Sequence, residues 1–293
     1  MDRDGDEVVN DEVREAIEHR IGSYGRVAVV AFSGGVDSSV VTALAAEALT
    51  PRRVTAVTAV SPSYPAGELE GAASVASDIG VEHRVVRTHE VDREAYATND
   101  ELRCYHCKAE LYATLSTIAR DAGDETTVLA GANADDLDDF RPGLWAGERA
   151  GIRNPLLEEH VRKPTVREIA RALGLRVAEK PALACLSSRV AQGIRITPEL
   201  LARIDAAERI VRALGFDLVR VRHHGVSAAI EVRPEDGDRL RDHPHLDATL
   251  GRIRALGWAD VAVDPLGYGV RKAALASGLG DSARRVSSII PPD

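Results

Sequence analysis

The sequence has few cysteines, few lysines and no long apolar segment. Its longest uninterrupted apolar run covers only residues 27–32, whereas a bilayer span needs about 20 residues, so we expect no membrane association. The first twenty residues are acidic and have no apolar core, which argues against a secretory signal. The odd cysteine count, with Cys104, Cys107 and Cys185, then favours reduced thiols and a cytoplasmic location.

Positive charge is also scarce. The net charge is −9, which disfavours nucleic-acid binding through a broad electropositive surface. A local basic patch is still compatible with this charge. Lysine occurs only at positions 108, 163, 180 and 272, and arginine supplies every other basic residue. The codon composition of the source explains this imbalance as well as a functional reason does. The 293 residues suffice for one large domain or two ordinary ones.

The first two thirds of the chain alternate between strand and helix patterns. Strands are predicted at residues 27–32, 54–60, 81–87 and 127–131, with a short fifth at 152–157. Helices are predicted at residues 11–23, 40–49, 68–80 and 104–121. This alternation predicts an α/β fold, in which a parallel sheet carries helices on both faces.

The pattern changes near residue 195. A helix from about 197 to 214 is followed by strands at 216–222 and 226–233, which form a possible hairpin with His223 in its turn. Further helices at 235–241 and 246–256 and a strand at 258–263 complete a smaller α+β unit. We therefore predict domains at 1–194 and 195–275, and a loose tail at 276–293.

The strongest motif is AFSGGVDSS, between the first strand and its helix. In α/β sheets, ligands bind outside the carboxyl ends of the strands, and a helix N-terminus there offers free N–H groups to an anion. Gly34 and Gly35 allow a tight turn, while Ser33, Ser38 and Ser39 add hydroxyls. It is not a Walker loop, because the Walker lysine is missing. An ordinary glycine turn with a serine cap is the alternative.

This motif resembles the phosphate loop of the PP-loop ATP pyrophosphatase superfamily (adenine nucleotide alpha hydrolase-like fold), whose members cleave ATP between its α and β phosphates. The resemblance implies that the loop holds pyrophosphate and that Asp37 ligates Mg²⁺ or holds the loop. Segments 103–112, 131–143, 154–158 and 180–189 resemble the LarE-type sulfur transferases. That family adenylates the carboxylates of pyridinium-3,5-biscarboxylic acid mononucleotide and converts them to thiocarboxylates in nickel-pincer cofactor biosynthesis. A sulfide donor and a homo-oligomer are further expectations of this resemblance.

Several polar residues are candidates for the same site. Asp135 and Asp136 follow the fourth strand and could hold Mg²⁺ or orient Arg141, or form a solvated acidic loop. Arg220 and Arg222 alternate along a strand and so share one face, where two guanidiniums can fork a phosphate. The resemblance implies that this pair, with Glu231 nearby, holds the nucleotide substrate; a solvated strand face is the alternative. Glu208, in mid-helix, is read as a surface acid, with a contribution to the site as the alternative. Glu158 is read as a site residue or a helix cap.

The cysteines leave several mechanisms open. The resemblance implies either a [4Fe-4S] cluster held by Cys104, Cys107 and Cys185, or a Cys185 whose own sulfur is sacrificed. Zinc or a structural role is a third possibility, since Cys-x-x-Cys also suits those uses. Two rival functions also remain. A related tRNA thiolation enzyme would need a basic surface that the net charge disfavours, and a non-catalytic ATP-binding regulator would need no cysteines.

Overall fold

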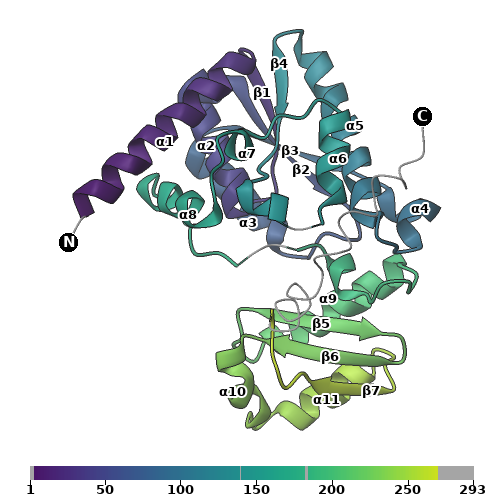
Figure 1. Ribbon diagram of the computed structural model, residues 1–293. Coiled ribbons are helices and arrows are strands. Elements are labelled where there is room, and N and C mark those ends of the chain that lie inside the picture. The colour runs from purple at the N-terminus through teal and green to yellow at the C-terminus, as the bar shows by residue number, and fades with distance from the viewer. Residues whose placement is uncertain (1–2, 139, 182–183, 270–293) are drawn as a thin grey trace. The chain divides into compact units, whose positions relative to one another are not determined.

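The chain divides into two compact units, Met1–Cys185 and Leu186–Asp293. The computed structural model describes residues 3–138, 140–181 and 184–269 (Figure 1). The division lies at Cys185, whereas the sequence analysis puts the domain boundary after residue 194. The predicted tail at 276–293 lies outside the described residues. No helix in the described part of the chain is both long enough and apolar enough to cross a membrane.

The first unit is built on a four-stranded parallel sheet with the order β3-β2-β1-β4. These strands are β1 (Val27–Ala31), β2 (Val54–Val60), β3 (Glu82–Arg87) and β4 (Thr126–Leu129). The helices that follow them cross over to the next strand, so all four carboxyl ends lie at one edge. The predicted parallel α/β sheet is confirmed.

Helices cover both faces of this sheet (Figure 1). On β1, Ala28 and Val30 pack into one apolar core with residues of α1, α2, α3 and α8, while Val29 packs into another with residues of α5 and α6. The helices of the unit are α1 (Arg3–Tyr24), α2 (Val36–Leu49), α3 (Glu68–Ile79), α4 (Glu94–Ala97), α5 (Arg103–Ala122), α6 (Pro142–Arg149), α7 (Pro155–Glu158) and α8 (Lys163–Ala172).

The fifth strand predicted at residues 152–157 is wrong. Arg153 forms only an isolated parallel bridge with Leu129, and α7 then begins at Pro155 because proline fits the first turn of a helix. The Glu158 carboxylate accepts the backbone N–H of Asn154 at the start of this helix and also pairs with Arg153. The capping role considered for Glu158 is therefore observed.

Between residues 186 and 269, the second unit combines a three-stranded sheet, in the order β5-β6-β7, with three α-helices. Strands β5 (Val219–His224) and β6 (Ser227–Val232) form the predicted antiparallel hairpin, and β7 (Asp260–Val263) pairs with β6 in parallel. The helices are α9 (Pro198–Arg212), α10 (Gly237–Arg241) and α11 (Leu246–Arg254). Helix α9 starts as predicted, with the Thr197 hydroxyl accepting the N–H of Leu200 at 3.2 Å.

His223 is not a turn residue, contrary to the prediction. It lies in β5, where it is buried, and Trp258 Nε1–H donates to its Nδ1 at 2.8 Å. The turn itself comes after His224, which pairs with Ser227. The apolar environment on that strand face, rather than the turn residues nearby, decides the place of His223.

Candidate active site

The serine- and glycine-rich loop connects β1 to α2 at the carboxyl edge of the sheet. Gly35 is the residue before the first turn of α2, and its carbonyl accepts the hydroxyls of Ser38 at 3.1 Å and Ser39 at 2.8 Å. Gly34 has a φ of 69°, and a β-carbon there would lie 2.8 Å from Cα of Ala72 in α3. Both the conformation and the close approach therefore require glycine at this position.

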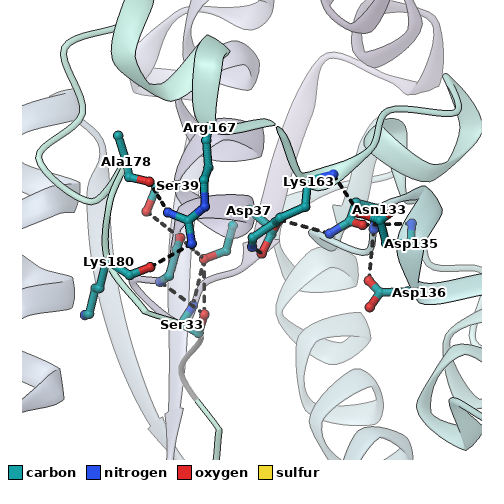
Figure 2. Close-up of polar contacts among 12 residues, drawn as sticks. Ser33, Asp37, Ser39, Asn133, Asp135, Asp136, Lys163, Arg167, Ala178 and Lys180 are labelled. Carbon is teal, nitrogen blue, oxygen red and sulfur yellow. Dashed lines mark hydrogen bonds and ion pairs between the residues drawn. The ribbon is translucent and has the colours of Figure 1, made fainter. Parts of the chain in front are cut away.

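Asp37, in the first turn of α2, faces two partners from other segments (Figure 2). Asn133 Nδ2 donates to its Oδ1 at 3.0 Å, and Lys163 Nζ lies 2.5 Å from its Oδ2. The side chains of Asp37 and Lys163 are 25% and 29% exposed, so the pair is open to solvent. A ligand that reaches this edge could compete for either partner.

The loop after β4 packs directly against this first turn of α2. A β-carbon on Gly131 would lie 2.8 Å from the Ser38 backbone nitrogen, which leaves no room for a side chain. The close approach places Asn133 beside Asp37. As the sequence predicts, the segments after β1 and β4 therefore meet at one sheet edge.

All four carboxylate oxygens of Asp135 and Asp136 accept protein donors. Asp135 receives the Arg162 guanidinium at 2.6 Å and the Lys163 backbone N–H at 2.8 Å. Asp136 receives the Asn133 backbone N–H at 3.0 Å and pairs with Arg141 at 3.0 Å. Of the three readings considered for these acids, the pairing with Arg141 is observed for Asp136. The Mg²⁺ role stays a prediction.

A second lysine lies on the other side of the loop (Figure 2). Lys180 Nζ is 2.8 Å from Glu68 and donates to the Gly34 carbonyl at 3.3 Å. Arg167, in α8, holds this segment by donating to the backbone carbonyls of Ala178 and Lys180. Two cations, Lys163 and Lys180, therefore flank the loop.

Sequence reasoning missed both of these lysines as site residues. The available signal was their rarity, because in a chain with only four lysines, two lie at the same loop. Arginine fills the other basic positions, many of them exposed on the surface. An ammonium is a compact point charge suited to phosphate, so its restriction to few positions carries information.

The three cysteines lie in one neighbourhood of the first unit. Cys104 and Cys107 are one turn apart near the start of α5. Cys107 interacts electrostatically with Cys185, and Lys108 interacts with all three thiols. Arg103 Nη2 lies 3.8 Å from Cys104 Sγ. Burial raises the pKa of Cys107 to about 12. Within the described residues, no three histidine, cysteine or acidic side chains are close enough together to hold a metal ion.

In the second unit, Arg220 and Arg222 share one face of β5, as predicted. Glu231 lies opposite Arg220 on β6 and accepts the Arg222 guanidinium at 2.9 Å, and Tyr268 stacks near both arginines. The face is not the solvated one considered as the alternative, since Arg220 and Glu231 are only 7% exposed. Burial, and then the charge of Arg189, lower the pKa of Arg220.

Glu208 is not a surface acid, contrary to the interpretation of the sequence. It is fully buried in α9, where it accepts Arg189 at 2.8 Å, Arg212 at 2.7 Å and the Val221 backbone N–H at 3.1 Å. The carboxylate joins α9 to β5 through these bonds. Helical spacing places Glu208 on the same buried face of α9 as Leu201, Ile204 and Val211, and this spacing was the available signal.

The comparisons with known proteins agree with this architecture. The asparagine synthase family model matches residues 8–137, which contain the phosphate loop. The pyridinium-3,5-bisthiocarboxylic acid mononucleotide synthase of Lactiplantibacillus plantarum is 35% identical over 240 residues, covering 82% of this chain and 86% of the relative. The chain belongs to the LarE-type family.

Two further relatives match over most of the chain. An uncharacterised protein of Synechocystis sp. is 42% identical over 241 residues, covering 82% of this chain and 89% of its own. An uncharacterised protein of Methanocaldococcus jannaschii is 27% identical over 207 residues, covering 71% and 78%. Membership of this LarE-type, PP-loop family makes the chain an ATP-using enzyme.

Proposed function

We propose that this protein is an ATP-dependent sulfur transferase that adenylates a pyridinium dicarboxylate mononucleotide and converts its carboxylates to thiocarboxylates. The observation that carries the proposal is the lysine-flanked loop between β1 and α2, in the same unit as three neighbouring thiols. The relative from Lactiplantibacillus plantarum, whose name describes a synthase of the bisthiocarboxylic acid mononucleotide, supports the choice of substrate.

The loop would bind the pyrophosphate end of MgATP. Backbone N–H groups at the start of α2 and the Ser33 hydroxyl offer donors to an anion, and Lys163 and Lys180 supply positive charge. Asp37 would contact the Mg²⁺ that arrives with ATP, after its present partner Lys163 turns toward the phosphates. A substrate carboxylate oxygen then attacks the α-phosphorus, and pyrophosphate leaves.

In the second unit, the arginine face of β5 would hold the phosphate of the mononucleotide. Arg220 and Arg222 are ordered by Glu231 and Tyr268 before any ligand binds, which lowers the entropy cost of forming a bidentate phosphate contact. Burial makes the contact stronger, because the phosphate charge is less screened there than in water.

Two sulfur sources fit the thiols. In the first, an iron–sulfur cluster would be held by Cys104, Cys107 and Cys185, because thiolates are the usual protein ligands of such clusters. Lys108 interacts with all three thiols. A [4Fe-4S] cluster on three thiolates would leave one iron free to carry an additional sulfide from a donor. Alternatively, the Cys185 thiolate displaces AMP from the acyl-adenylate. Loss of the Cα proton then breaks its Cβ–S bond and leaves dehydroalanine.

The test uses the full chain, purified without oxygen, with MgATP and the pyridinium dicarboxylate mononucleotide. We expect release of pyrophosphate and AMP that requires this substrate, and none with tRNA in its place. A protein that binds ATP but releases no pyrophosphate with either acceptor would instead be a nucleotide-binding regulator.

The sulfur source is tested by iron content and by mass spectrometry of the same preparation. We expect about four irons per chain, lost in Cys104→Ala, on the basis of the three-thiol donor set. A colourless protein whose Cys185 becomes dehydroalanine after one turnover would establish the sacrificial route. In that case Cys104→Ala would retain its single turnover.

A further inference from the structure

A buried carboxylate outside the proposed machinery lies between the phosphate loop and the thiols. Glu90, in the single 3₁₀ turn Glu90–Asp92 after β3, is only 3% exposed. Ser61 and Ser63, which follow β2, both donate their hydroxyls to its Oε1, at 2.5 and 3.0 Å. One carboxylate oxygen of Glu90 therefore accepts hydrogen bonds from both serine side chains at the start of the connection from β2 to α3.

These serine bonds fix a segment that reaches the phosphate loop. The Ser63 backbone N–H donates to Ser61 Oγ at 3.1 Å, and the Tyr64 N–H donates to the Ser61 carbonyl at 3.0 Å, which closes a tight turn. The Tyr64 hydroxyl then lies 3.5 Å from the Ser33 carbonyl. The position of this tyrosine beside the loop thus depends on a turn that Glu90 holds.

The segment around Glu90 is also fastened to the helix that carries two thiols. The His89 N–H donates to Glu110 Oε1 at 2.5 Å, and Arg93 pairs with Glu110 Oε2 at 2.7 Å. Glu110 lies on α5 one turn after Cys107, and the Glu90 carboxylate acts electrostatically on that thiol. One short stretch of chain therefore contacts both the turn beside the phosphate loop and the helix of Cys104 and Cys107.

We propose that Glu90 is a positioning residue: it holds the turn at residues 61–64 to the segment that His89 and Arg93 fasten to helix α5, so that the phosphate loop and the thiols are coupled through this segment. A charged acceptor holds two hydroxyls more firmly than a neutral one. An apolar replacement would leave the half-buried Ser61 and the buried Ser63 with only each other's hydroxyl as a side-chain partner, which weakens the turn. The contribution to sulfur transfer rests on the proposed function; the contribution to ATP binding does not.

The test measures binding of a non-hydrolysable ATP analogue by calorimetry and the alkylation rate of Cys104, with and without the analogue. Glu90→Ala, and separately the double variant Ser61→Ala, Ser63→Ala, should each weaken analogue binding about ten-fold. Glu90→Gln, which keeps an acceptor oxygen, should restore most of the affinity. The control is Asp92→Asn in the same turn, whose side chain is 69% exposed.

Coupling predicts a second result. In the unsubstituted protein the analogue should change the alkylation rate of Cys104, and this response should be lost in the Glu90→Ala and serine variants but kept in Asp92→Asn. The inference is overturned if the serine variant folds and matches the control in both affinity and thiol response. Wild-type protein that binds the analogue but makes no thiocarboxylate would refute the proposed function and leave this inference standing.

Discussion

The two units carry their charges in different ways. At the phosphate loop of the first unit, the pairs Asp37–Lys163 and Lys180–Glu68 have side chains between 25% and 31% exposed. In the second unit, the Arg189–Glu208 pair has side chains 1% and 0% exposed. The first arrangement leaves its ions in contact with water, whereas the second removes them from it.

This difference teaches what each set of charges can do. Partly exposed pairs contribute little to stability and exchange partners cheaply, which suits an edge that must receive a polyanion. A buried pair is expensive to break, because removing one partner leaves the other charge without compensation. The exposed charges of the first unit are therefore suited to ligand binding, whereas the buried charges of the second unit stabilise the position of strand β5.

The largest effect should come from removing the buried acid of the second unit. Glu208→Ala leaves Arg189 buried without its counter-ion and should lower the free energy of unfolding by about 3–5 kcal/mol. Denaturant titration followed by circular dichroism measures this. Glu208→Gln, which keeps acceptors for the Val221 N–H, should cost less. A loss below about 1 kcal/mol in the alanine variant would contradict the comparison.

The next effect should come from the contact between the β4 loop and α2. Gly131→Ala places a β-carbon 2.8 Å from the Ser38 nitrogen and must displace the phosphate loop. Such overpacking costs about 1–3 kcal/mol, and we expect ATP affinity to fall at least ten-fold. Gly22→Ala in α1 is the control, since nothing lies within 4 Å of its added carbon. Unchanged affinity in Gly131→Ala would show that the loop tolerates movement.

A smaller effect is expected from the exposed ion pairs. Lys163→Ala and Lys180→Ala should each change the free energy of unfolding by at most about 1 kcal/mol while weakening ATP binding about ten-fold. Calorimetry and thermal melting separate the two quantities. Lys163→Arg keeps the charge and should recover part of the affinity. If either alanine variant unfolded instead, the distinction between the two units would fail.

The smallest effect concerns pH. Because Trp258 donates to Nδ1 of His223, the buried ring is neutral, and burial lowers its pKa below the unfolded value of about 6.5. Below that pH the unfolded chain binds more protons at this ring, so the contribution of His223 to stability is constant above pH 6.5 and falls as the pH decreases. Chemical denaturation at pH 5.5 and 7.5 should show this slope. His223→Asn should reduce the slope by less than about 1.4 kcal/mol per pH unit.

Much of the first unit was predictable from sequence because its signals are local. Residues 27–32 form a continuous apolar run since β1 is buried on both faces, and the glycines and serines after it mark the turn into α2. The thiol neighbourhood and the shared face of Arg220 and Arg222 also follow from the sequence pattern and the resemblance.

Two of the failures share a physical cause, which is that a deciding partner lies far away in the chain. Glu208 resembles a surface acid in the sequence because its partners Arg189 and the Val221 N–H lie in other segments. His223 resembles a turn residue because its partner Trp258 is distant in the chain. For Asp135 and Asp136 the sequence named Arg141 as a possible partner, and that pair is observed with Asp136, but nothing indicated Arg162 beside Asp135. A single sequence shows periodicity and turn residues, but it does not show which residues contact each other in the folded chain.

The scarcity of lysine at the phosphate edge has a consequence for chemical probing. Amine-selective acylation has only four side-chain targets in the chain, and Lys163 and Lys180 flank one loop. Peptide mass mapping after brief acylation should therefore report occupancy of that loop at these two positions separately from Lys108, Lys272 and the α-amino group, because arginine does not react. An occupant that contacts both ammoniums should remove two labels at once, whereas one that reaches a single side of the loop should remove only one.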